Sequence, residues 1–123
     1  MTFNMQHAEE FRLKNHLPFK TRVCRATQKS LIVEEFKEFL EEEQKMVGGI
    51  RKNEADCLKE LADLVYVCYQ YASCQEWDLD QAMLRVHTSN LSKLGADGQP
   101  IYREDGKVLK GPNYQPPDLS DLV

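Results

Sequence analysis

Two pairs of acidic residues have the spacing that brings carboxylates together. Glu35 and Glu38 lie three residues apart in one stretch of the chain, and Glu60 and Asp63 lie three residues apart in another. On an α-helix an i, i+3 pair shares one face, so two neighbouring antiparallel helices can turn such pairs towards each other. Carboxylate oxygens are ligands that Mg²⁺ prefers and that Mn²⁺ also accepts. The sequence therefore predicts a Mg²⁺ site formed by these four residues.

The surroundings of Asp63 strengthen this prediction. After Glu60 the chain is apolar almost all round a helix, and Val67 continues the face that carries Glu60 and Asp63. A dry, ionised carboxylate needs a cation, hydrogen-bond donors or a metal. Two alternatives stay open. The acidic run around Glu35 can be a solvated face, or the carboxylates can form salt bridges between helices, with partners taken from Lys29, Lys37 and Lys59.

Four helices are expected to position these side chains. Apolar periodicity and capping residues predict helices over about 4–14, 27–46, 53–74 and 78–93. Asn4, Asn53 and Asp78 are the expected N-caps, and Gly48-Gly49 is expected to end the second helix.

The chain after residue 95 has a different pattern. Asp105-Gly106 predicts a hairpin with a two-residue turn that places Glu104 opposite Lys107, and the proline-rich end predicts an extended tail. The expected fold is an all-α four-helix bundle with a small C-terminal β-hairpin and an extended tail. We expect a single domain over residues 1–123, with a helical core over about 4–94 and the hairpin and tail over 95–123.

Composition limits the classes of function. The 123 residues carry 16 Lys and Arg against 20 Asp and Glu, a formal net charge of −4. This acidic balance argues against a protein that coats nucleic acid or an anionic membrane, because both need a basic surface. No signal peptide or membrane-spanning stretch is evident. The cysteines Cys24, Cys57, Cys68 and Cys74 show no C-x-x-C or zinc spacing, so a reduced, cytoplasmic protein is expected.

The predicted fourth helix carries two polar residues on its apolar stripe. Leu79, Met83 and Val86 are continued at the same angle by Asn90 and Lys93. These two residues either mark the end of the buried stripe or reach a bound ligand, where an ammonium group would meet phosphate oxygens.

Together these motifs resemble those of a known superfamily. Glu35-x-x-Glu38, a gap of 21 residues and Glu60-x-x-Asp63 are similar to the signature of the all-α nucleoside triphosphate pyrophosphohydrolases, which include MazG proteins, dimeric dUTPases and phosphoribosyl-ATP pyrophosphohydrolases. The stretches 87–94 and 97–119 resemble the single-domain MazG-like group of bacteria and their phages. The resemblance covers nearly all of residues 31–119.

The resemblance implies an activity and roles for residues. It implies Mg²⁺-dependent hydrolysis of a nucleoside triphosphate between the α- and β-phosphates, with Glu35, Glu38, Glu60 and Asp63 as metal ligands. Glu34 occupies the position of the general base of some relatives, and Asn90 and Lys93 match positions that contact substrate. The resemblance also implies a homo-oligomer, a dimer or a tetramer. An unusually apolar third helix agrees with this expectation.

Other functions remain to be distinguished. A di-iron carboxylate bundle would need Glu-x-x-His pairs, which the chain lacks. A catalytically degenerate nucleotide-binding or protein-interaction bundle is the second alternative, and the intact acidic motifs count against it. Arg103, Lys107 and Lys110 are expected to face water, and Tyr114 is expected to anchor the tail. The preferred base is not fixed by any motif.

Overall fold

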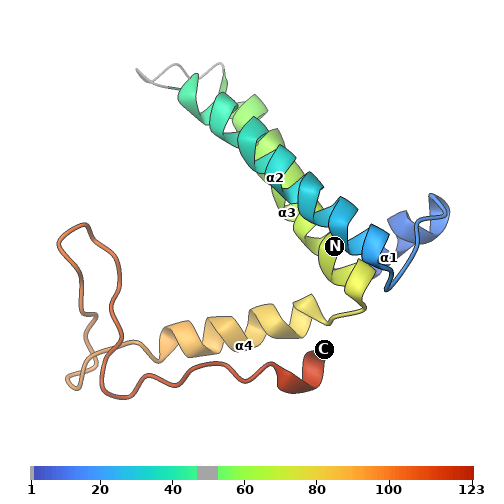
Figure 1. Cartoon of the computed structure of the whole chain (residues 1–123). Helices are drawn as coiled ribbons and strands as arrows, with labels where there is room; N and C mark the ends of the chain where they lie inside the picture. The colour runs from blue at the N-terminus through green and yellow to red at the C-terminus, as the bar shows by residue number, and fades with distance from the viewer. Residues whose placement is uncertain (1, 47–52) are drawn as a thin grey trace. The chain divides into compact units, whose positions relative to one another are not determined.

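Four α-helices dominate the computed structural model, which describes residues 2–46 and 53–123. They are α1 (Met5–Lys14), α2 (Arg22–Gln44), α3 (Glu54–Gln75) and α4 (Leu79–Leu91), followed by a short 3₁₀ turn, η2 (Ser120–Leu122) (Figure 1). The predicted all-α class with four helices is confirmed for these residues. The chain divides into two compact units, Met1–Trp77 and Asp78–Val123, and each is described by itself. The single domain stays a prediction.

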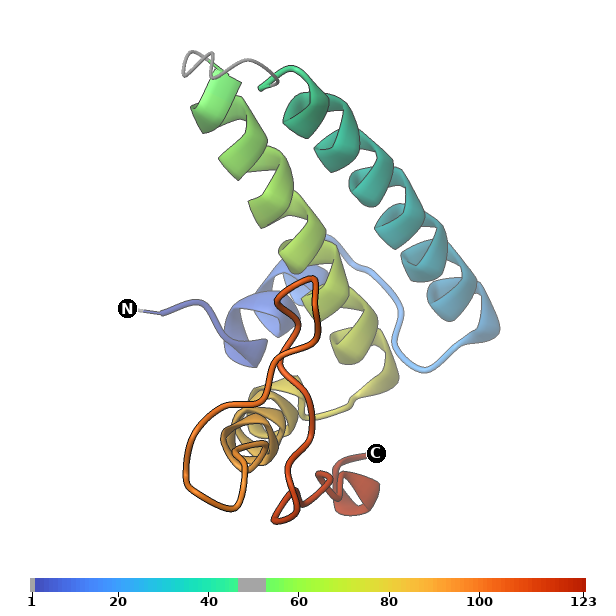
Figure 2. The same cartoon turned by 90° about the vertical axis from the view of Figure 1, so that its left-hand side faces the viewer.

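The first unit is built on two long helices. Helices α2 and α3 lie antiparallel and side by side, and α1 packs against α3 (Figures 1 and 2). Phe3, which precedes α1, contacts the rings of Tyr66 and Tyr69 on α3 with centroid separations of 5.2 and 5.1 Å. Phe11 of α1 meets the edge of the Tyr66 ring. Aromatic packing therefore holds the first helix on the third.

Local side-chain bonds fix where the helices begin. The Asn4 side chain accepts a hydrogen bond from the Gln6 N–H at 2.9 Å, and Asp78 accepts one from the Gln81 N–H at 3.0 Å. Both predicted N-caps are confirmed. Asn53 also holds the N-cap position of α3, although its side chain donates to the Lys45 carbonyl instead of capping the helix.

Three predicted helix limits differ from the structure by two residues or more. Helix α2 begins at Arg22 instead of residue 27, because the Thr21 hydroxyl caps it by accepting from the Cys24 N–H at 2.9 Å. Helix α2 ends at Gln44 and helix α4 at Leu91, each two residues before the predicted limits of 46 and 93. The predicted stop at Gly48-Gly49 lies outside the described residues.

The most deeply buried part of the first unit lies where α1, α2 and α3 meet. Arg12 of α1 is 1% exposed and donates to the Gln70 side chain of α3, which in turn donates to the Ala8 carbonyl. Beside them Cys24 and Cys74 form a disulfide between the first turn of α2 and the last turn of α3. The expectation that the cysteines are unpaired was wrong for these two, whereas Cys57 and Cys68 are free.

The second unit consists of α4 and the tail that runs back along it. Arg85 on α4 donates to both carboxylate oxygens of Asp121 and to the Asp118 carbonyl, and Ser89 donates to the Gln115 carbonyl at 2.7 Å. The Asp78 N–H donates to the Leu122 carbonyl at 3.2 Å. The extended, proline-rich tail is therefore held to one helix by polar contacts.

The predicted β-hairpin is not seen as strands in the described part of the chain. One antiparallel bridge, between Tyr102 and Val108, replaces it. The Gly106 N–H donates to the Arg103 carbonyl, and Gly106 has φ +89°, so the loop has three residues and not the predicted two. Glu104 consequently lies in the turn and not opposite Lys107.

Several large apolar side chains of the first unit remain exposed. They form what we call the apolar face: Val33, Phe36 and Leu40 on α2, and Leu58, Leu61 and Val65 on α3. Their exposed fractions run from 41% to 66%, so this side of α3 is not packed within the described chain as its apolar spacing had predicted. None of the described helices combines the length and the apolar character that crossing a membrane requires.

Candidate metal centre

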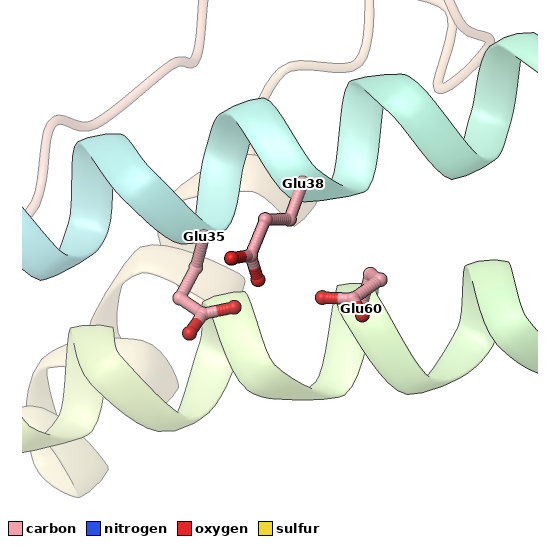
Figure 3. Close-up of side chains that lie close together, drawn as sticks. All are labelled: Glu35, Glu38 and Glu60. Carbon is pink, nitrogen blue, oxygen red and sulfur yellow. The ribbon is translucent and has the colours of Figure 1, made fainter.

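Three of the four predicted carboxylates meet between α2 and α3. Glu35 and Glu38 extend from α2 towards α3, and Glu60 extends from α3 towards them (Figure 3). One oxygen from each residue lies within 4.8 Å of the others, and all three residues are half-buried. We call these residues the carboxylate cluster. The acidic side of α2 at this point therefore faces a neighbouring helix instead of solvent.

The cluster contains buried oxygens that lack a hydrogen-bond partner. The Oε2 atoms of Glu35 and Glu60 are fully buried, and neither has a partner among the described residues. Buried carboxylate oxygens without partners are costly, because they lose the solvation that ionised groups have in water. Hard, unsatisfied oxygens from two helices are a donor set that suits a divalent cation such as Mg²⁺.

Crowding within the cluster shifts the pKa of Glu38. A hydrogen bond with Glu35, followed by the negative charge of Glu35, raises the pKa of Glu38 above its ordinary value. A weaker hydrogen bond with Glu60 acts in the opposite direction. Glu38 therefore interacts with both other members of the cluster. Repulsion within the cluster thus favours the protonated form of Glu38.

Asp63 occupies a different position from the one predicted. It is not one of the three converging carboxylates. Its Oδ2 forms an ion pair with Lys59 Nζ at 2.7 Å, and its side chain is 36% exposed. Lys59 also lies 3.4 Å from Glu60 Oε1, and these two acids together raise the pKa of Lys59. Both ion pairs lie within α3, so they are not the salt bridges between helices of the alternative, and Lys29 and Lys37 form no ion pair with the cluster in the described structure.

Glu34 lies on α2 next to the cluster but points elsewhere. It is exposed, and its charge contributes only the smallest of the effects that raise the pKa of Glu38. Adjacent residues on a helix point about 100° apart, so Glu34 stands beside the cluster without joining it.

Asn90 and Lys93 belong to the second unit. Asn90 is exposed near the end of α4, and Lys93 follows that helix, with its N–H donating to the Asn90 carbonyl at 3.2 Å. The Lys93 carbonyl accepts from the Gly111 N–H, which holds the tail there. Contact of these two residues with substrate stays a prediction.

The basic residues of the turn and tail have local partners. Arg103 Nε donates to Asp105 Oδ1 at 2.8 Å, and the Lys110 ammonium lies 4.8 Å from the centre of the Tyr114 ring. Both contacts lie within the loop and tail. Lys59 was expected only as one of three possible salt-bridge partners, although its i, i+4 spacing to Asp63 is a signal for that ion pair.

Comparisons of the chain with models of known protein families and with curated proteins found no match.

Proposed function

We propose that this protein is a Mg²⁺-dependent nucleoside triphosphate pyrophosphohydrolase. It would cleave a ribo- or deoxyribonucleoside triphosphate between the α- and β-phosphates and release the monophosphate and pyrophosphate, for control of the nucleotide pool or removal of damaged nucleotides. The observation that carries the proposal is the carboxylate cluster with its two buried, unpartnered oxygens. The resemblance of both acidic motifs to those of the all-α pyrophosphohydrolases supports the same reaction.

In this proposal four residues would hold the cation. Glu35, Glu38 and Glu60 already converge, and Asp63 would join them by exchanging its ion pair with Lys59 for the metal. Bound Mg²⁺, which Mn²⁺ can replace, would offset the charge of the triphosphate and lower the pKa of coordinated water. Lys59 would then be left near the ligand as a cation, where it favours phosphate oxygens.

The second unit would supply contacts to the substrate. An amide such as that of Asn90 and an ammonium such as that of Lys93 suit the hydroxyl and phosphate groups of a nucleotide. These roles rest on the polar continuation of the α4 stripe and on the resemblance. They require that Lys93 presents its side chain, and not only its backbone, to the ligand.

Exposure of the apolar face supports a homo-oligomer. Six large apolar side chains, each 41–66% exposed, would lose contact with water if two copies met on this face. Large apolar side chains that are exposed in such numbers on two neighbouring helices are typical of protein interfaces. The protein would then be a dimer or tetramer. The same face also supports the alternative of a catalytically degenerate interaction module, so activity must be measured directly.

A product assay tests the proposal. The protein is incubated with Mg²⁺ and a panel of canonical and modified ribo- and deoxyribonucleoside triphosphates, and pyrophosphate and orthophosphate are measured separately. Pyrophosphate and the monophosphate in equal amounts are expected for at least one member of the panel. Orthophosphate as the direct product would contradict the reaction. No turnover with any nucleotide would favour the degenerate interaction module.

Glu34 gives a separate prediction about the general base. Glu34→Gln is expected to lower kcat by about 100-fold, the range of a lost general base, while Mg²⁺ binding is unchanged. Isothermal titration with Mg²⁺ and steady-state kinetics measure the two effects. A parallel loss of metal affinity would instead make Glu34 a ligand.

A further inference from the structure

A buried cation lies at the junction of α1, α2 and α3. Arg12 is 1% exposed, and its guanidinium donates to Gln70 Oε1 at 3.2 Å, to the Pro18 carbonyl and to Cys24 Sγ at 2.8 Å. It also lies 5.4 Å from the centre of the Phe19 ring. Each of these partners is neutral. Burial accordingly lowers the pKa of Arg12, since the charged form is desolvated.

The group best placed to provide an anion is Cys24. A buried charge is expensive unless an opposite charge lies against it. In the disulfide Cys24 Sγ is neutral and only a weak hydrogen-bond acceptor. As a thiolate the same atom would face the guanidinium at 2.8 Å and complete a buried ion pair. The contact is therefore better suited to the reduced form of Cys24 than to the oxidised form.

The two halves of the disulfide lie at opposite helix ends. Cys24 is in the first turn of α2, where the helix presents its positive end, and its N–H is held by the Thr21 hydroxyl. Cys74 is in the last turn of α3, where carbonyl groups predominate, and its own carbonyl accepts from the Lys20 N–H at 2.7 Å. A helix N-terminus and an adjacent cation both lower the pKa of a thiol, whereas a helix C-terminus does not. Of the two sulfurs, Cys24 is therefore the one that its surroundings would stabilise as a thiolate after reduction.

We propose that Cys24 and Cys74 form a reversible thiol–disulfide exchange site whose reduced state is a Cys24 thiolate paired with Arg12. Its reaction partners would be small thiols and disulfides of the glutathione class. Reduction breaks the Cys24–Cys74 bond and joins the sulfurs of two partner thiols. The partner thiols supply two electrons and two protons, of which one protonates Cys74 and the other goes to solvent. A stabilised reduced state makes the disulfide readily reducible. The inference does not depend on the proposed hydrolase activity.

The remaining charges near the pair do not replace Arg12. Lys20 and Glu76 lie 3.8 Å apart at the surface near Cys74, and Arg22 and Arg25 are exposed on the first turns of α2. The Pro18 carbonyl oxygen lies 3.0 Å from Cys24 Sγ, but it also accepts from Arg12. Burial raises the pKa of the two free cysteines, Cys57 and Cys68, so both stay protonated near neutral pH and add little to the thiolate signal.

The pH dependence of reduction tests the proposal. The protein is equilibrated from both directions with reduced and oxidised glutathione between pH 5.5 and 7.5, and the two forms are counted by mass spectrometry after acid quenching. Equilibration is required because the sulfurs are at most 2% exposed. Release of one proton predicts an equilibrium constant for reduction that rises with pH above the pKa of Cys24, by up to about tenfold per pH unit. A constant that does not change with pH, or cysteines that stay reduced in excess oxidised glutathione, would overturn it.

Matched variants assign the effect to the two residues. Cys74→Ser leaves Cys24 alone, and its pKa, measured by thiolate absorbance near 240 nm, is expected below about 7. Cys24→Ser leaves Cys74, which is expected to titrate above about 8.5. Arg12→Gln should remove the pH dependence of reduction and Arg12→Lys should retain it. If Arg12→Gln does not fold, the two single-cysteine variants decide, and equal pKa values in both would refute the proposal.

Discussion

Glu38→Gln is expected to lower Mg²⁺-dependent release of pyrophosphate by at least about 10-fold. Loss of a residue that only supports a metal ligand already costs about 10- to 100-fold, and loss of the ligand itself should cost no less. Glu38 is the member of the cluster that interacts with both Glu35 and Glu60. Its replacement therefore removes the carboxylate that links the other two. The amide keeps the size of the side chain and removes only the charge. The measurement is steady-state pyrophosphate release at saturating Mg²⁺.

The chain offers a matched control on the same helix. Glu41 is exposed on α2 one turn after Glu38, and it lies outside the cluster. Glu41→Gln is therefore expected to retain activity within about twofold, because exposed charges away from a site contribute little. Circular dichroism should show unchanged helical content in both variants. Equal activity of Glu38→Gln and Glu41→Gln would mean that the cluster is not the metal site.

Helices were predicted well where the signal was local. The caps at Asn4 and Asp78 depend on side chains that bond to backbone two or three residues away, and the sequence shows such residues directly. The start of α2 was placed too late because the apolar pattern is weak over its first turn. The prediction did not include Thr21, whose hydroxyl group is the N-cap of α2 in the structure.

Contacts between distant residues were the ones missed. Cys24 and Cys74 are 50 residues apart, and the spacing of cysteines does not fix their pairing.

The length of the loop at Asp105-Gly106 was also predicted wrongly, because the Asp-Gly dipeptide alone favours a two-residue turn. In the structure the Asp105 carboxylate binds the Arg103 side chain and the Lys107 N–H, which favours the longer loop.

The acidic site was predicted in part. Helical spacing placed Glu35 and Glu38 on one face, and antiparallel packing brought Glu60 to them. The same reasoning put Asp63 with them, but Lys59 lies one turn before it and forms an ion pair with it. Whether Asp63 pairs with Lys59 or joins the other carboxylates depends on the relative free energies of the two arrangements. The spacing of residues along the helix does not give these free energies.

The second large effect concerns stability in the absence of metal. In EDTA, Glu38 is expected to add a contribution to the free energy of unfolding that grows as the pH falls from 7 towards 5. The pKa of Glu38 is raised above its ordinary value of 4.5 by Glu35, so the folded state binds this proton more tightly than the unfolded state. Its stabilising contribution is therefore complete below the unfolded pKa and is lost as the pH rises through the folded pKa.

Mg²⁺ should reverse this pH dependence, because its carboxylate ligands must be ionised. Mg²⁺ at 100 times its dissociation constant would stabilise the folded state by about 2.7 kcal/mol, so the gain should be large at pH 7 and small at pH 5. The range stops at pH 5 because hydrogen bonds lower the pKa of Asp105, Asp118 and Asp121 below 3.8, and their contribution is lost only at lower pH. Urea unfolding of the wild type and of Glu38→Gln measures the effect. If both proteins have the same pH slope in EDTA, the carboxylates do not repel one another in solution, and the case for a cation between α2 and α3 loses its physical basis.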